Sequence, residues 1–428
     1  MSSHKIVALG AGLTGLSFAY HMDENIPVFE KDSKVGGLAQ TINIGDYNFD
    51  LGPHLLHIRS SIIRKFITSE LGVGLKKYKR VAKIYFEKKI IDYPFEMNLH
   101  AVSSRVRKEC LNGLNSIHER RHSNDTLLRI GSYKDYAVNA YGDGIARNYL
   151  LPYNRKIWAI DPSQITCEWM HFLPSADIEK IKKGSERPLS YDFGYNVEFY
   201  YPQKCGIQQI SNALAANLSS ICLDEEAVRL DLINKTIYFS NGRQVRYKSL
   251  ISTIPLRALI EMTGDLKLVN ISKQLTNNRV YIINIVIEGV VPSDVHWIYF
   301  PEREFSFYRI SLPNSYFRFC APPKRHIIAA EVSTRNPEMD ISRLKNEVIK
   351  EIKNLNIFNI KKVILIHIKE IPIAYCIYDK NRTKTVEFLR QHLESHDVIT
   401  SGRYGMWEYS CMEDAILQGR SLALRMRS

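Results

Sequence analysis

The sequence predicts an α/β fold, in which a Rossmann-like parallel sheet is combined with a helical insertion and a second, mainly antiparallel β-sheet domain. Three observations support this prediction. A short apolar strand at Lys5–Leu9 runs into a glycine-rich turn and then a helix. Residues 98–186 are polar and helix-like, with few strand-like runs. From Tyr281 onward, apolar residues alternate or run together in strand-length pieces around one amphipathic helix.

The changes of pattern along the 428 residues suggest how the domains are divided. We expect the Rossmann-like domain to be discontinuous, with its parts at residues 1–92, 196–262 and 393–428. A mainly helical domain should occupy residues 93–195. The antiparallel sheet should occupy residues 263–392 and bind the substrate.

The chain carries a formal net charge of +13. Such a charge suits a nucleic-acid or membrane binder, or a protein that holds anionic small molecules. Lysine and arginine are dispersed, apart from short clusters such as Arg105–Lys108, and no nucleic-acid-binding motif is present. We therefore favour phosphate-bearing small molecules over nucleic acid, with a polyanion-binding surface as the alternative.

The seven cysteines are scattered and have no metal-ligand spacing. We expect buried thiols in a reducing compartment, with no disulfide and no metal. No apolar run approaches about 18 residues, and the amino terminus lacks a signal-peptide pattern. These observations predict a cytoplasmic protein without membrane insertion, and they leave the oligomeric state open.

The turn after the first strand reads Gly10-Ala11-Gly12-Leu13-Thr14-Gly15. In a strand–turn–helix setting, Gly10 permits the tight turn and Gly15 permits close packing of helix on strand. Gly12 lets the backbone approach a pyrophosphate, which would lie at the amino terminus of the helix. Leu13 and Thr14 should contact the same ligand.

A second predicted strand, Ile26–Phe29, ends at Glu30, whose carboxylate can accept both hydroxyls of a ribose. A second glycine pair, Gly36-Gly37, follows shortly afterwards, although a surface turn is the alternative interpretation. This combination is typical of FAD proteins of the glutathione-reductase-like superfamily and not of simple NAD dehydrogenases. We therefore predict an FAD site, with further contacts from Lys31, Leu38, Ala39, Val228, Gly402 and Met412.

His54 follows an apolar strand end and a Gly52-Pro53 turn, which would bring the chain close to a planar ligand. A single histidine is more often structural than catalytic. We expect His54 to lie near the flavin edge and to tune the reduced state, without acting as an acid–base catalyst.

Motifs farther along the chain resemble the UDP-galactopyranose mutases, and the eukaryotic branch more than the bacterial one. The similarity covers most of the chain and depends on the order and spacing of the motifs. These are Arg80 with Tyr93-Pro94-Phe95, Pro152–Ala159, Gly194-Tyr195-Asn196 with Tyr201-Pro202, Trp297–Glu302 with Phe307-Tyr308-Arg309, and Gly402–Tyr409.

The resemblance implies a flavin-dependent isomerase that interconverts the pyranose and furanose forms of a nucleotide-diphosphate sugar, most simply a UDP-linked one. In that family, N5 of reduced FAD attacks the anomeric carbon with no net redox change, and the galactofuranose formed serves cell-surface polysaccharide biosynthesis. NADPH or NADH would act as the external reductant.

The resemblance also implies roles for individual residues. Arg309 and Arg403 would clamp the diphosphate, because a guanidinium offers paired donors to phosphate oxygens. These two arginines and His54 form the predicted catalytic set. The remaining predicted substrate contacts are phosphate-binding hydroxyls on Tyr299, Tyr375 and Tyr409, uracil-end contacts from Asn154 and Trp158, and further contacts from Arg80, Tyr93, Glu96 and Asn196.

Three positions depart from the family pattern. Pro53 replaces a glycine and removes a backbone N–H, Glu96 replaces a glutamine, and Leu173 replaces an arginine. The identity of the sugar is therefore left open. The rival interpretations are an FAD-dependent oxidoreductase of the amine oxidase or desaturase type, against which the two arginines argue, and a flavin-binding protein that has lost its chemistry.

Overall fold

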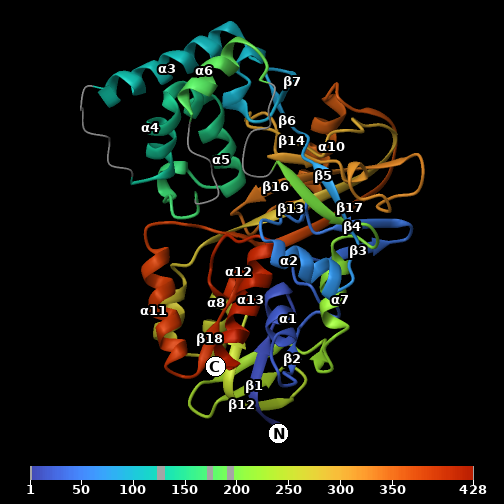
Figure 1. Ribbon diagram of the computed structural model, residues 1–428, viewed down its shortest axis with the longest axis vertical. Coiled ribbons are helices and arrows are strands. Elements are labelled where there is room, and N and C mark those ends of the chain that lie inside the picture. The colour runs from blue at the N-terminus through green and yellow to red at the C-terminus, as the bar shows by residue number, and fades with distance from the viewer. Residues whose placement is uncertain (1, 123–130, 171–176, 190–196, 428) are drawn as a thin grey trace. The chain divides into compact units, whose positions relative to one another are not determined.

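The computed structural model describes residues 2–122, 131–170, 177–189 and 197–427. The chain divides into two compact units, which are described separately (Figure 1). The first unit comprises residues 1–77, 199–276 and 381–428. The second unit comprises residues 78–198 and 277–380.

A seven-stranded sheet forms the centre of the first unit. Five of its strands are parallel. β1 (Ser2–Leu9) lies between β2 (Val28–Phe29) and β12 (Gln244–Ser252). β9 (Ile221–Cys222) pairs with β2, and β18 (Val398–Thr400) pairs with β12. The run Ile6–Leu9 is fully apolar and buried, as expected for a parallel strand covered on both faces. An antiparallel edge is added by β11 (Thr236–Phe239) and β10 (Ala227–Asp231).

Helices and a small hairpin complete the first unit. α1 (Leu13–Tyr20) packs against α13 (Met412–Arg427), where Gly419 leaves no room for a side chain beside the carbonyl of Thr14 (Figure 1). The other elements are β3 (Thr41–Ile44), β4 (Tyr47–Asp50), α2 (Ser61–Lys65), the π-helical η1 (Phe66–Glu70), α7 (Gln208–Ala215), α8 (Leu256–Thr263), α9 (Leu266–Ser272), α11 (Arg382–Glu394) and α12 (Gly402–Gly405).

A second seven-stranded sheet lies in the second unit, in the order β17 (Asn359–Cys376), β13 (Asn277–Val290), β16 (Arg325–Thr334), β15 (Arg309–Ser311), β14 (Trp297–Tyr299), β6 (Ala82–Phe86) and β7 (Lys89–Asp92). Its strands pair antiparallel except for β14 with β6. α10 (Ile341–Asn354) packs the apolar side chains of Leu344, Val348 and Ile352 onto this sheet. The prediction of a second, mainly antiparallel sheet is confirmed.

The helical part of the second unit confirms the prediction for the described parts of residues 98–186. It contains η2 (Phe95–Met97), η3 (Leu99–Ala101), α3 (Ser104–His122), α4 (Tyr133–Ile145), the π-helical η4 (Ala146–Leu150), α5 (Leu151–Trp158), η5 (Pro162–Gln164) and α6 (Ile178–Glu186). A short η7 (Pro313–Ser315) follows β15. α3 and α4 cross at Gly113 and Gly144, where a Cβ on Gly113 would lie 2.9 Å from the Gly144 nitrogen.

One predicted strand boundary differs from the structure, because the second strand is expected at Ile26–Phe29. Pro27 lacks the N–H that a longer β2 would need, so β2 begins at Val28.

The chain passes between the units at four points. Two fall within β5 (Leu75–Lys79) and β8 (Glu198–Pro202), which form a two-stranded sheet, and the other two follow Thr276 and Lys380. Residues 82–92, grouped from the sequence with the Rossmann-like domain, thus supply β6 and β7 of the second sheet. α9 and most of α11, grouped with residues 263–392, lie in the first unit. The five-segment division stays a prediction.

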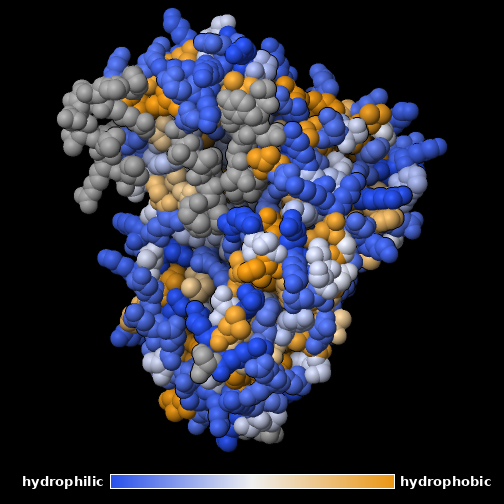
Figure 2. Space-filling view, viewed as in Figure 1, coloured by the Kyte–Doolittle hydropathy of each residue, from blue (hydrophilic) through white to orange (hydrophobic). Residues whose placement is uncertain are grey.

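On the face shown in Figure 2, apolar side chains are scattered among hydrophilic ones. Within residues 2–122, 131–170, 177–189 and 197–427, no helix is both long enough and apolar enough to cross a membrane. All seven cysteines are present as free thiols.

Asp50 in β4 gives the first unit a measurable pH dependence. Its carboxylate accepts hydrogen bonds from the hydroxyls of Tyr201 and Thr41, and burial raises its pKa to about 6, although these bonds oppose the rise. The folded state therefore holds the proton more tightly than the unfolded state, so stability is greatest below the unfolded pKa and falls as pH rises toward 6. The difference corresponds to about 3 kcal/mol.

We expect the Asp50→Asn variant to lack this dependence. We measure the free energies of unfolding of the parent and the variant in urea. The difference between them should shift by about 2 kcal/mol in favour of the variant from about pH 4 to pH 6.5. Asp46→Asn is the matched control, because Asp46 is exposed in the same β3–β4 hairpin. A difference between parent and Asp50→Asn that stays constant over this range would contradict the prediction.

Candidate functional site

The loop Gly10–Gly15 has the geometry of a phosphate-binding turn. Gly10 has a φ of +97° and no room for a Cβ beside the Thr253 hydroxyl, and a Cβ on Gly15 would collide with the carbonyl of Gly10. Gly12 differs, because a Cβ built there meets no atom within 4 Å. Gly12 is also the N-cap residue of α1, so open space lies where backbone N–H groups and the helix dipole favour an anion.

Glu30 lies at the end of β2 and is 8% exposed. Its carboxylate accepts hydrogen bonds from the backbone N–H groups of Ala11 at 2.8 Å and Asp32 at 3.0 Å. Burial raises the pKa of this carboxyl, and the two backbone bonds act in the opposite direction. Each oxygen retains a lone pair for a further donor, so the side chain can accept ribose hydroxyls while it fixes the glycine loop to the strand.

The second glycine pair lies beside the first. The N–H of Gly36 donates to the carbonyl of Ala11 at 2.8 Å, and Gly12 and Gly36 form a parallel bridge. Gly36 and Gly37 have φ values of +115° and +57°, which glycine adopts readily. The structure thus brings together two motifs that the sequence placed in one site.

The other predicted cofactor contacts differ in how far their side chains are exposed to solvent. Leu13, Thr14 and Ala39 are buried, and Leu38 and Met412 are partly buried. Gly402 packs on α1, and a Cβ added to it would lie 2.7 Å from the Thr14 hydroxyl. Lys31 is exposed and Val228 is 49% exposed, so neither is buried by the protein itself.

Two residues of the predicted catalytic set, His54 and Arg403, also lie in the first unit. His54 is partly buried, and its backbone N–H donates to the carbonyl of Gly52 at 2.8 Å. Arg403 lies in α12, donates to the carbonyl of Ser410 at 2.9 Å, and places its guanidinium 5.0 Å from the ring centre of Tyr409.

Two buried polar residues that support this site were not predicted. Gln208 of α7 donates to the carbonyl of Val35 and accepts from the N–H of Thr41, which braces the second glycine loop. Glu413, 1% exposed near the start of α13, accepts from the backbone N–H groups of Arg59 and Ser60. Both act on backbone far away in sequence, so no local pattern identifies them.

A metal is not needed to explain the cluster of Cys411, Glu413 and Asp414. The guanidinium of Arg59 forms ion pairs with both carboxylates, and the Asp414 carboxylate accepts from the N–H of Cys411. The cluster joins the loop before α2 to the start of α13.

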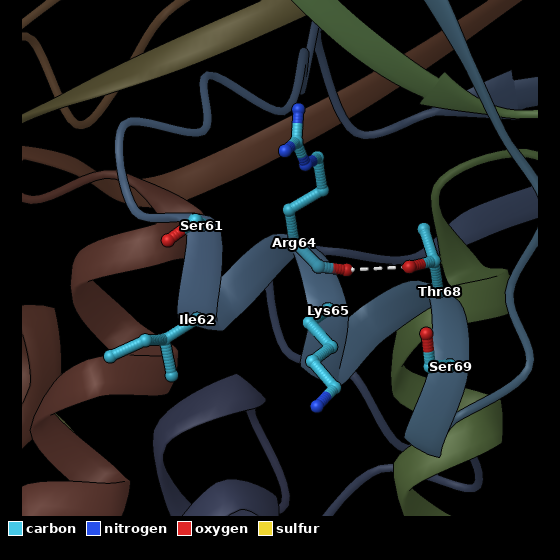
Figure 3. Close-up of a pocket in the computed structure, with 6 residues that line it drawn as sticks. All are labelled: Ser61, Ile62, Arg64, Lys65, Thr68 and Ser69. Carbon is cyan, nitrogen blue, oxygen red and sulfur yellow. Dashed lines mark hydrogen bonds between the residues drawn. The ribbon is translucent and has the colours of Figure 1, made fainter.

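A surface hollow of about 450 Å³ lies over α2 and η1 (Figure 3). Arg64 and Lys65 point in different directions, and the bond drawn between the labelled residues joins the Thr68 hydroxyl to the Arg64 carbonyl. None of the predicted site residues lines this hollow. We therefore assign it no functional role.

In the second unit, Arg309 is held by a buried carboxylate. Its Nε and Nη2 donate to the two oxygens of Glu331 at 2.6 and 2.7 Å, and the Tyr308 hydroxyl donates to the same carboxylate at 2.7 Å. Glu331 is 3% exposed and lies directly opposite Arg309 in the β15–β16 ladder. Among the described residues, Nη1 of Arg309 has no assigned partner, so its donors remain available for an anion.

Asn154 and Trp158 form an internal hydrogen-bond network. The Asn154 oxygen accepts from the Trp158 indole at 3.2 Å, and its amide nitrogen donates to the Tyr133 hydroxyl and the Leu150 carbonyl at 2.8 and 2.9 Å. The amide hydrogens of Asn154 are thus already used, and Trp158 is 2% exposed. The uracil-end contacts that the resemblance implies for Asn154 and Trp158 stay a prediction.

Two rows of neighbouring aromatic rings occupy the same unit. One row runs through Tyr149, Tyr153, Tyr299 and Tyr93, with successive ring centres 5.2 to 5.7 Å apart, and the guanidinium of Arg80 lies 4.8 Å from the Tyr93 ring. The other row runs through Tyr141, Tyr136, Tyr133, Trp169, Trp158 and Tyr375. Of the remaining predicted positions, Glu96 is partly buried beside these rings, whereas Asn196 and Leu173 lie outside the described residues.

Arg309 and Arg403 belong to different units. Their expected convergence on one diphosphate therefore stays a prediction.

Comparisons with known proteins agree with this geometry. Residues 9–68 match the family model of an NAD(P)-binding Rossmann-like domain. An L-amino-acid oxidase from Sistrurus catenatus edwardsii is 24% identical over 32% of this chain, and a probable flavin-containing monoamine oxidase A from Dictyostelium discoideum is 23% identical over 59%. The aligned parts span 33% and 57% of those two proteins.

A solved structure is similar over much more of the chain. The crystal structure of reduced UDP-galactopyranose mutase is 25% identical, with a TM-score of 0.91, over 99% of this chain and 93% of that one. The predicted Rossmann-like fold with a second sheet is thereby confirmed. Together with the adjacent glycine pairs and Glu30, these similarities identify the chain as a flavoenzyme of the superfamily that contains both the flavin oxidases and UDP-galactopyranose mutase.

Proposed function

We propose that this protein is a flavin-dependent isomerase that interconverts the pyranose and furanose forms of a nucleotide-diphosphate sugar, most simply a UDP-linked one. The observation that carries the proposal is the similarity to UDP-galactopyranose mutase across both units, at a TM-score of 0.91. The oxidase alignments, by contrast, cover 32% and 59% of this chain.

FAD fits the residues of the first unit. The open face of Gly12 and the start of α1 suit its pyrophosphate, Glu30 suits a ribose, and Gly36-Gly37 lie beside that loop. When bound and reduced, FAD would supply the nucleophile for a glycosyl transfer without net redox change. An external reductant, NADPH or NADH, would prepare the cofactor, with His54 near its edge.

The second unit supplies the groups for a diphosphate leaving group. Arg309 is fixed in orientation by Glu331, so its remaining donors need little reorganisation to stabilise negative charge. Tyr299 and Tyr375 belong to the two aromatic rows and can donate hydroxyl hydrogen bonds. Arg403 and Tyr409 of the first unit would complete the phosphate contacts.

An oxidoreductase of the amine oxidase type is the second candidate, because the oxidase relatives share the FAD-binding region. Such an enzyme needs no diphosphate clamp, whereas the guanidinium of Arg309 is held in place by the buried Glu331 carboxylate, which also accepts from the Tyr308 hydroxyl.

The two candidates are separated by a product assay. Dithionite-reduced protein is incubated without oxygen with a panel of UDP-linked hexopyranoses, and the pyranose and furanose forms are separated by chromatography. We expect at least one sugar to reach the same pyranose-to-furanose ratio from either direction. Failure to convert any nucleotide sugar, together with oxidation of an amine, would contradict the proposal.

A further inference from the structure

Asn278 is a fully buried polar residue to which the proposed function assigns no role. It lies near the start of β13 and its exposed fraction is 0%. Its Nδ2 donates to the carbonyl of Ile157 at 2.8 Å and to the Ser333 hydroxyl at 2.8 Å. Its Oδ1 accepts from the backbone N–H of Tyr375 at 2.9 Å. One side chain thus joins β13 to α5, β16 and β17.

These hydrogen bonds lie at an irregularity in the pairing of β13 with β17. The register shifts between Asn278, which lies opposite Tyr375, and Val280, which lies opposite Ile371. One residue of β13 therefore faces three residues of β17. Such a bulge interrupts the regular ladder and changes the direction of the side chains beside it. The side-chain oxygen of Asn278 fixes the main chain of β17 at the point where Tyr375 leaves it.

The same amide holds the end of α5. The carbonyl of Ile157 is one of the last four of this helix, which have no partner within the helix itself. Trp158 follows it directly and is 2% exposed. Its ring packs edge-on against the ring of Tyr375, with the ring centres 5.5 Å apart. Asn278 therefore restrains the main chain at Tyr375 and at the residue that packs on the Tyr375 ring.

Tyr375 lies near the guanidinium that we propose as a diphosphate ligand. Burial lowers the pKa of Arg309, whereas Glu331 and Tyr375 are among the neighbours that raise it above its ordinary value. A hydroxyl close to this guanidinium is placed to donate to the same phosphate. Ordering a side chain on binding costs affinity, so a hydroxyl that is already fixed binds phosphate more tightly.

We propose that Asn278 is a positioning residue for substrate binding, which fixes the Tyr375 hydroxyl where it donates to the diphosphate of the nucleotide sugar. This inference rests on the proposed function. The amide of Asn278 is used within the protein, so it acts on the ligand through Tyr375. Loss of a neutral hydrogen bond of this kind corresponds to about a two- to tenfold loss of affinity.

A double-mutant cycle measures this action. UDP affinity is determined by calorimetry for the FAD-loaded parent, Asn278→Leu, Tyr375→Phe and the double variant. Each single variant should bind UDP about two- to tenfold more weakly than the parent. The double variant should bind UDP as tightly as Tyr375→Phe alone, because the effect of Asn278 passes through the Tyr375 hydroxyl. FAD content should match the parent in all variants.

Thermal stability separates positioning from a purely structural role. Leucine has nearly the volume of asparagine but leaves the N–H of Tyr375 and the carbonyl of Ile157 without their partner. Asn278→Leu should therefore lower the melting temperature whether residue 375 is tyrosine or phenylalanine, whereas it should lower UDP affinity only with tyrosine. If Asn278→Leu gives no folded protein, Asn278→Ser replaces it, because serine fits the site but is too short to make all three bonds.

Asn284→Leu is the matched control. Asn284 is a 3% exposed asparagine of the same strand, about 20 Å farther along β13, and its amide lies 3.5 Å from Nδ1 of His367. This variant should lose thermal stability and keep the UDP affinity of the parent.

Four results would overturn the inference: unchanged UDP affinity in Asn278→Leu, unchanged UDP affinity in Tyr375→Phe, losses of affinity that add in the double variant, or an equal loss in Asn284→Leu. If the parent still binds UDP and Arg309→Ala weakens that binding, only the role of Asn278 is wrong. If the parent does not bind UDP, the proposed function is wrong as well.

Discussion

Replacing Gly12 with aspartate should abolish FAD binding while the protein remains folded. A Cβ at this position meets no atom within 4 Å, so the side chain fits the protein itself. The added carboxylate would instead face the pyrophosphate at the start of α1, and the two negative groups would repel each other. Flavin absorbance of the purified protein measures the loss, and circular dichroism checks the fold.

Gly12→Asn provides the matched control, because asparagine has nearly the same size as aspartate and no charge. We expect it to retain more flavin than Gly12→Asp, with any loss due to bulk alone. Full flavin occupancy in Gly12→Asp would show that the cofactor does not approach this loop.

Removal of Arg309 should produce the largest effect on substrate binding. A charge-assisted phosphate contact contributes roughly 1.5–3 kcal/mol, so Arg309→Ala should weaken UDP binding by about ten- to a hundredfold. Arg309→Lys should have intermediate affinity, because lysine keeps the charge but not the paired donors. FAD content should be unchanged in both variants.

The Arg309–Glu331 pair requires a further control. Arg309→Ala leaves the buried carboxylate of Glu331 without its partner, which is destabilising by itself. The double variant Arg309→Ala/Glu331→Gln removes that unpaired charge and should recover thermal stability but not UDP affinity. Arg403→Ala should weaken UDP binding similarly from the first unit. UDP affinity equal to the parent in both arginine variants would exclude a diphosphate clamp.

The cofactor site could be predicted from sequence because its information is local. Gly10, Gly12 and Gly15 act within one strand–turn–helix unit, and Glu30 and Gly36-Gly37 follow in fixed order. Their chemistry depends on backbone geometry, which the residue types dictate.

The supporting residues could not be predicted in the same way. Glu331 meets Arg309 only through the β15–β16 register, and Gln208 and Glu413 act on backbone from other parts of the chain. Asn154 is expected at the ligand because its motif resembles a binding segment, and its hydrogen bonds to Tyr133 and to the Leu150 carbonyl could not be predicted from that motif. The chain crosses between the units inside β5 and β8, where composition does not change, so no sequence pattern marks those points.

The number of product molecules formed per NADPH oxidised tests the central claim most directly. The protein is reduced with limiting NADPH in the absence of oxygen and then supplied with excess nucleotide sugar. Because the proposed isomerisation consumes no electrons, many furanose molecules should form for each NADPH oxidised. Product that stops at one molecule per NADPH, or that requires stoichiometric oxygen, would instead identify a flavin oxidoreductase.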